Sequence, residues 1–335
     1  TYLLDFRAFA QAPFQAGLEG DLTTNMLLRP VAYATFFVNH ALDGFDPRWF
    51  RAVNIGLHMA NGWLVFALLR RLGMAMVERG WLRGKSAVFI AMTAALWFVV
   101  HPLATESVTY IVQRFTSMGT CLLLLCVNLH LRSLDTGGKR MRWLRAGAVV
   151  AALAGMLTKE DVVTAPLLAV GLDWLVLGTR LRTALWRGLP LLLCLPLVPG
   201  LVMVVAWAQN DGVWSLSQAF NLVNLRDRPW THWHYIITEW TVMIEYLRLL
   251  LWPAGQNLDP AWPLYDSILA PRVLGAVAGL TLIVGGTWYL RHRWSADGRW
   301  RLAAAFVLWF FGTLFVSSGL VPLPQVMAEH RTYLP

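Results

Sequence analysis

The sequence has 335 residues, of which 57% are hydrophobic and only 14% are charged, and it contains 18 Trp residues. Soluble globular proteins usually carry about 25% charged residues, so this composition excludes an ordinary soluble enzyme. The formal net charge of +9 is compatible with nucleic-acid binding. However, the basic residues gather in short connections between apolar runs, which is typical of a membrane protein.

Apolar runs long enough to cross a bilayer recur along the chain. Residues 29–42, before the first of them, are too short to span, and Pro30 suits the first turn of a short interfacial helix. We then predict eight membrane helices, at residues 49–70, 87–101, 106–131, 143–158, 161–178, 187–208, 271–290 and 301–320. The sequence therefore predicts an all-α, polytopic integral membrane protein.

Most of the positive charge has a consistent position in this topology. Of the 28 Lys and Arg residues, 17 fall, with three acidic residues, in four predicted connections: 70–86, 132–145, 178–187 and 291–301. Short loops rich in Lys and Arg stay cytoplasmic, so the opposite helix ends are predicted to face the exterior. If 231–252 were a further span, the basic loop at 291–301 would lie on the exterior, against the rule that such loops stay cytoplasmic. We therefore expect 231–252 to be an amphipathic helix in the outer interface.

This pattern predicts one membrane domain with an elaborated outer face. Its parts are an outer loop with an interfacial helix (1–48), six spans (49–208), an outer loop with an amphipathic helix (209–270), two further spans (271–320) and a last outer loop (321–335). Neither end has the features of a natural terminus, so we expect a fragment, or further helices beyond both ends. The three Cys residues lie in apolar runs and lack the spacing of a metal site or a disulfide framework.

The stretch HPLATESVTYIVQR, residues 101–114, places ionisable groups between two apolar runs. Such groups cost roughly 2.5–3.5 kcal/mol at membrane depth even on a lenient scale, and they usually have a function. We interpret Glu106 and Arg114 as functional, whereas His101 is either functional or only a cap. If 106–131 is one helix, a polar stripe follows Glu106 on the same face, and we interpret it as helix-to-helix hydrogen bonding: Tyr110, Gln113, Ser117 and Thr120.

Four other groups of polar residues are candidates. Asn54, His58 and Asn61 share one face of the 49–70 helix, and polar contacts between helices explain them adequately. The triplet Lys159, Glu160 and Asp161 is either a solvated turn or a phosphate site with Lys159 as a point charge. In the last loop, Arg331 of the Glu329-His330-Arg331 triplet offers a planar donor fork for phosphate oxygens. Near the start, Asp5 is either a general base or a surface residue.

The longest of these motifs occur together in an order that resembles a known family. LRPVAYATFFVNHALDGFDPRWFRAVNIGLHMANGWLVFALLRRL, HPLATESVTYIVQR, LTKEDVVTAPLL and VMAEHRTYLP resemble bacterial membrane proteins related to protein O-mannosyltransferases. These belong to the GT-C superfamily of lipid-linked sugar transferases, and many carry C-terminal tetratricopeptide repeats, which this sequence lacks. The resemblance implies a GT-C-like helical bundle with its active face towards the periplasm or exterior of a bacterial inner membrane.

The resemblance also implies roles for individual residues. The donor is expected to be a polyprenyl-phosphate sugar, and the acceptor a hydroxyl of an exported protein. Asp5 corresponds to the family's essential acidic residue, where the family often has an Asp pair and this chain has Leu4-Asp5. Asp5 and Glu106 are the predicted catalytic residues. The predicted donor-phosphate ligands are Arg114, Lys159, His330 and Arg331, and the predicted supporting residues are His101, Glu160, Glu329, Asn54 and His58.

Two other function classes stay open. A non-catalytic membrane subunit or scaffold, descended from such a transferase, fits the single Asp5. A transporter fits less well, because transporters usually show two related halves and none is evident here. We expect no cofactor, no metal ion and no nucleic-acid partner, whereas membrane lipids and further membrane subunits are expected partners.

Overall fold

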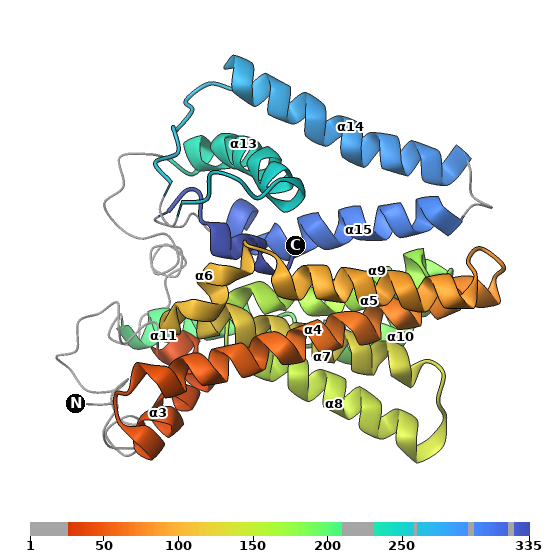
Figure 1. Cartoon of the computed structure of the whole chain (residues 1–335), viewed down its shortest axis with the longest axis horizontal. Helices are drawn as coiled ribbons and strands as arrows, with labels where there is room; N and C mark the ends of the chain where they lie inside the picture. Colours follow the sequence, from red (N-terminus) through yellow and green to blue (C-terminus); the bar gives the residue numbers. More distant parts are fainter. Residues whose placement is uncertain (1–25, 210–230, 258–259, 294–297, 321–324) are drawn as a thin grey trace.

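The computed structural model describes residues 26–209, 231–257, 260–293, 298–320 and 325–335, and long helices dominate them (Figure 1). Four helical segments are long and apolar enough to cross a membrane: Pro47–Glu78, Ile111–Ser133, Leu181–Ala208 and Pro271–Arg293. Two shorter apolar helices occupy Gly84–Val100 and Trp300–Leu314. The all-α, polytopic membrane architecture is confirmed, while the boundaries of its loop and span groups stay predictions.

The helices follow the predicted order. The first half contains α3 (Pro30–Asp43), α4 (Pro47–Glu78), α5 (Gly84–Val100), α6 (Ala104–Thr109), the turn η2 (Ile111–Gln113), α7 (Arg114–Ser133) and α8 (Gly138–Met156). The turn η3 (Glu160–Thr164), α9 (Ala165–Leu175), α10 (Leu181–Leu192) and α11 (Leu197–Gln209) complete this part. The last part contains α13 (His232–Leu251), α14 (Pro271–Arg293), α15 (Gly298–Leu314), η4 (Val316–Leu320) and η5 (Glu329–Tyr333).

The single helix predicted at 106–131 is wrong, because the chain breaks between α6 and α7. Tyr110 has an extended backbone, with φ −83° and ψ 118°. The break frees backbone carbonyls, and the side-chain amide of Asn54 donates to those of Tyr110 and Ile111 at 3.3 and 3.4 Å. Glu106 therefore does not share a continuous helix with the polar residues of α7.

The predicted 187–208 helix is also interrupted. The chain turns between α10 and α11, where Pro196 has no backbone N–H to continue a helical ladder. The predicted 161–178 span begins with the 3-10 turn η3, and only then continues as α9. Helix α13 covers the segment predicted to be amphipathic, and it is not among the described helices with the length and composition of a span.

Small residues allow close helix packing, as is usual within membranes. Ala87, Ala91 and Ala95 form the buried face of α5. On α4, a Cβ atom at Gly62 would lie 2.4 Å from a methyl group of Val99, and one at Gly73 would lie 3.1 Å from Cβ of Ala87. The close contact between α4 and α5 thus depends on Gly residues of α4 and Ala residues of α5.

The two ends of the bundle differ in charge. The C-terminal ends of α4, α7 and α14 lie at one end of the molecule, on the right in Figure 1, and α3 and α6 lie towards the other. The first end carries the described residues of the four basic connections recognised in the sequence. Hereafter it is the basic end, and the end that carries α3 and α6 is the opposite end.

Candidate functional site

The turn η5 is the centre of the candidate site, because it contacts residues from several distant motifs. His330 donates its backbone N–H to Oε2 of Glu106 at 3.1 Å, and its ring Nδ1 lies 2.9 Å from Oε1 of the same carboxylate. Both oxygens of Glu106 therefore hold His330. Glu106, on the short helix α6, is a positioning residue in this arrangement.

The protonation state of His330 follows from this geometry. Burial lowers the pKa of His330 below its usual value, although the hydrogen bond and charge of Glu106 act to raise it. The ring is therefore neutral at pH 7, and an Nδ1–H that donates to Glu106 leaves Nε2 as an acceptor. A neutral His330 can accept a proton, but it does not supply the positive charge expected of a phosphate ligand.

Lys159 and His330 line the same small cavity, together with Arg331. Nζ of Lys159 lies 3.1 Å from the hydroxyl of Thr116 and 3.1 Å from Oδ2 of Asp161, and its side chain keeps 18% of its exposure. The cavity volume is about 30 Å³, enough for a water molecule and too small for a sugar phosphate. A donor head group would require the lining to move.

Arg331 is deeply buried beside this cavity. Its Nη1 donates to Oε1 of Glu239 at 3.2 Å, to the hydroxyl of Tyr235 at 3.3 Å and to the carbonyl of Val326 at 3.1 Å. Burial raises the pKa of Glu239 to about 7, against the attraction of Arg331. Because these contacts occupy much of its donor fork, Arg331 ties η5 to α13 and adds positive charge to the cavity wall.

Glu160 faces away from this cavity and pairs with Arg29, just before α3. Nε and Nη2 of Arg29 donate to the two carboxylate oxygens, with distances of 2.9, 3.2 and 3.0 Å. Burial acts to raise the pKa of Glu160, but the charge and hydrogen bonds of Arg29 outweigh it, so the pKa is lowered. The pair anchors the start of α3 to η3.

The polar face of α4 receives the end of η5. The hydroxyl of Tyr333 lies 2.7 Å from Nδ1 of His58 and accepts from the amide of Asn61 at 3.0 Å. Nε2 of His58 lies 3.0 Å from the carbonyl of Val99, so Nδ1 is the acceptor of the Tyr333 proton. His58 is therefore a packing residue that positions the candidate site.

Arg114 lies apart from the cavity and is fully buried, with 0% relative exposure. Its guanidinium donates to the side chains of Asn54 and Asn39 at 3.1 and 2.9 Å. It also donates to the carbonyls of Thr35 and Phe50 at 3.2 and 3.0 Å. The phosphate role predicted for Arg114 does not fit this arrangement, because these contacts instead join α3, α4 and α7.

Other predicted residues have supporting positions. His101 accepts the backbone N–H of Leu103 at 3.3 Å and contacts the carbonyl of Leu250 at 3.2 Å, which fits the interpretation as a cap. Glu329 accepts the backbone N–H of Asn257 at 2.7 Å, and burial raises its pKa. Asp5, the predicted base, lies outside the described residues.

Sequence reasoning did not assign site roles to Arg29, Glu239 and Tyr333. The signal for Glu239 was an acid inside a helix with a buried face, and the signal for Tyr333 was its position directly after Glu329-His330-Arg331. In the described part of the chain, no group of three His, Cys, Asp or Glu side chains is placed to hold a metal ion.

The chain is similar to several curated proteins. Protein O-mannosyl-transferase Tmtc2 of Drosophila melanogaster is 28% identical over 276 residues, which cover 78% of this chain and 27% of the relative. Human protein O-mannosyl-transferase TMTC1 is 36% identical over 115 residues, or 34% of this chain and 12% of the relative. Human protein O-mannosyl-transferase TMTC4 is 32% identical over 165 residues, which cover 47% of this chain and 22% of the relative.

The chain thus spans about a quarter or less of the length of these relatives. No protein-family model and no solved structure matches it. The relationship to protein O-mannosyl-transferases that the motifs predicted is confirmed by these similarities.

Proposed function

From this relationship, we propose that the chain is the membrane part of a glycosyltransferase that moves a sugar from a polyprenyl-phosphate donor to a protein hydroxyl. The names of the relatives favour mannose as the first sugar to test. The observation that carries the proposal is the cavity lined by Lys159, His330 and Arg331. These residues come from two distant motifs, and Glu106 of a third holds His330.

The reaction is a displacement at the anomeric carbon. The acceptor oxygen bonds to that carbon while its bond to the donor phosphate oxygen breaks, so polyprenyl phosphate leaves with the bonding electrons. The proton of the acceptor hydroxyl passes to a base, for which Asp5 is the candidate by resemblance. Fixed positive charge near the leaving phosphate favours this step, and Lys159 is the best-placed partly exposed cation.

The orientation belongs to the same proposal. The basic end is assigned to the cytoplasm by its Lys and Arg content, so the candidate site faces the exterior or periplasm. The membrane is proposed to be a bacterial inner membrane. The lipid-linked donor reaches the site from within the bilayer, and the protein acceptor reaches it from the outer side.

The test is sugar transfer from polyprenyl-phosphate mannose to an exported acceptor protein, using full-length protein and four variants. Asp5→Asn is expected to abolish transfer, and Lys159→Met to raise the KM for the donor. Glu106→Gln is expected to lower kcat, because a Gln amide can donate to Nδ1 of His330 and so shift its proton to Nε2. Lys139→Met, at the basic end, is the matched control and is expected to keep full activity.

Two outcomes would contradict the proposal. Full activity of Asp5→Asn in folded protein would remove Asp5 as the base. No transfer by the wild-type protein across several donors and acceptors would favour the alternative function, a non-catalytic membrane subunit, for which the single Asp5 in place of an Asp pair is the supporting observation.

A further inference from the structure

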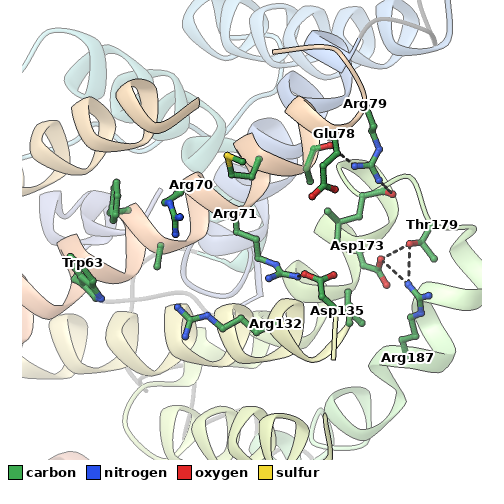
Figure 2. Close-up of a pocket in the computed structure, with 16 residues that line it drawn as sticks. Trp63, Arg70, Arg71, Glu78, Arg79, Arg132, Asp135, Asp173, Thr179 and Arg187 are labelled. Carbon is green, nitrogen blue, oxygen red and sulfur yellow. Dashed lines mark hydrogen bonds and ion pairs between the residues drawn. The ribbon is translucent and has the colours of Figure 1, made fainter. Parts of the chain in front are cut away.

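A second and much larger cavity, of about 550 Å³, lies at the basic end (Figure 2). Its walls come from the last turns of α4, the end of α7 and the segment from α9 to α10. Five arginines line it: Arg70, Arg71, Arg79, Arg132 and Arg187. Three acids also line it, Glu78, Asp135 and Asp173, so the lining carries a net positive charge.

Three of the five arginines already have partners within the protein. Arg71 pairs with Asp135, and Nη1 of Arg187 lies 3.6 Å from Oδ1 of Asp173. Arg79 donates to the carbonyls of Ala75 and Leu177 at 2.5 and 2.6 Å. The contacts of Arg71 with Asp135, Arg187 with Asp173 and Arg79 with Leu177 join the elements that form the walls.

Arg70 and Arg132 remain, and both are exposed. Neither guanidinium group has a hydrogen-bond or ion-pair partner among the residues that the structure describes. Figure 2 shows Arg70 on α4 with its side chain towards α7, and Arg132 lying along α7; both line the cavity. Two guanidinium groups without partners in the lining of one cavity are suited to an oxyanion such as phosphate.

The position of the cavity indicates where the phosphate comes from. Trp63 lies seven residues before Arg70 on the same face of α4, is 69% exposed and also lines the cavity. The two residues are about 10 Å apart along the helix axis. An exposed Trp suits the boundary between lipid tails and head groups, and Phe66 and Met74 add apolar lining. Arg70 then lies at the depth of lipid phosphates.

We propose that this cavity binds the phosphate head group of an anionic membrane lipid, with Arg70 and Arg132 as the phosphate ligands. The site lies at the other end of the bundle from the η5 cavity, so it does not depend on the proposed transferase function. A bound lipid would bridge α4 and α7 on the cytoplasmic side and stabilise their contact.

The experiment measures lipid binding to detergent-purified full chain by native mass spectrometry and by the shift in Tm. The probes are phosphatidylglycerol, phosphatidylcholine and inorganic phosphate. Phosphatidylglycerol is expected to bind and to raise Tm, whereas the other two have little effect. The double variant Arg70→Gln/Arg132→Gln is expected to weaken binding by about tenfold or more.

The matched control is Arg140→Gln/Arg142→Gln, which removes the same charge from exposed positions at the start of α8, outside the cavity. It is expected to retain binding. Arg70→Lys/Arg132→Lys keeps the positive charge but lacks the guanidinium groups. It is expected to bind phosphatidylglycerol more tightly than Arg70→Gln/Arg132→Gln does. The proposed site would be wrong if Arg70→Gln/Arg132→Gln and Arg140→Gln/Arg142→Gln lost lipid binding equally. It would also be wrong if phosphatidylglycerol neither bound nor raised Tm. Equal protection by inorganic phosphate would overturn a lipid as its ligand.

Discussion

At the scale of single residues, His330 gives the protein a defined dependence on pH. Because burial lowers its pKa below the usual 6.5, the folded state favours the neutral ring. The stability gained in this way is complete above pH 6.5 and is lost as the pH falls towards the lower folded pKa. His330→Gln is therefore expected to flatten the fall in Tm between pH 7.5 and 5.

The control for this experiment is His232→Gln, since His232 is exposed at the start of α13. It is expected to leave the pH profile of Tm unchanged. A wild-type profile that His330→Gln does not alter would show that the ring titrates alike in the folded and unfolded states, contrary to its burial.

Arg114 allows a second prediction at this scale. Its four hydrogen bonds reach two side-chain amides and two carbonyls, and one ammonium group cannot reach all of them. Arg114→Lys is expected to lower stability by about 2–4 kcal/mol, because buried polar groups lose their partners. Unfolding in detergent measures the loss, and Arg51→Lys, at an exposed position of α4, is the control. A stable Arg114→Lys protein with only a raised donor KM would instead support the phosphate role.

At the scale of elements, the packing of η3 against α8 requires a glycine, Gly155, at the contact. A Cβ atom at Gly155 of α8 would lie 2.6 Å from a methyl group of Val162 and 3.2 Å from Cβ of Leu122. Gly155→Ala is expected to displace η3, and Lys159 with it, at a cost of about 1–3 kcal/mol for overpacking. The measurement is unfolding in detergent together with the KM for the donor.

Gly285→Ala is the matched control, because nothing lies within 4 Å of a Cβ atom at that helical position. It is expected to be neutral or to stabilise α14 by up to about 1 kcal/mol, as Ala is the better helix former. Val162→Ala added to Gly155→Ala is expected to restore part of the loss. Equal stability of Gly155→Ala and wild type would mean that η3 shifts without cost.

The elements also show what the sequence could predict. The length of the apolar runs located most of the helices, because lipid-facing and buried surfaces both require apolar residues. It missed the break at Tyr110, since that break depends on Asn54, 56 residues away, which satisfies the freed carbonyls. For the same reason, spacing placed Glu106 on one helical face with Ser117 and Thr120, although the fold puts Glu106 on α6 and the other two on α7.

At the scale of the whole molecule, the proposed orientation can be measured directly. Single Cys residues introduced into a Cys-free protein at Thr136, near the basic end, and at Asn257, beside Glu329, should differ in labelling. In intact cells, a membrane-impermeant maleimide is expected to label position 257 and not 136, because the basic end is proposed to face the cytoplasm. Permeabilised cells, in which both positions react, are the control. The reverse pattern would place the candidate site inside the cell.

The candidate site was only partly predictable at this scale. The sequence identified Glu106, Lys159, His330 and Arg331, because ionisable groups at membrane boundaries are rare and costly. The sequence could not predict which of these side chains form ion pairs or hydrogen bonds with other residues of the chain. The Arg29–Glu160 and Arg331–Glu239 pairs join residues 131 and 92 positions apart, and only the packing of the helices brings them together.

Helix α4 connects both ends of the molecule. It runs for 32 residues without an internal Pro, a length of about 48 Å, whereas the hydrocarbon core of a bilayer is about 30 Å thick. Its first half holds η5 through His58 and Asn61, and its last turns carry Arg70 and Arg71. A thinner bilayer favours a larger tilt of such a helix, and that tilt would displace both cavities together. Membrane thickness would then act on the η5 cavity and on the cavity at the basic end through one continuous helix.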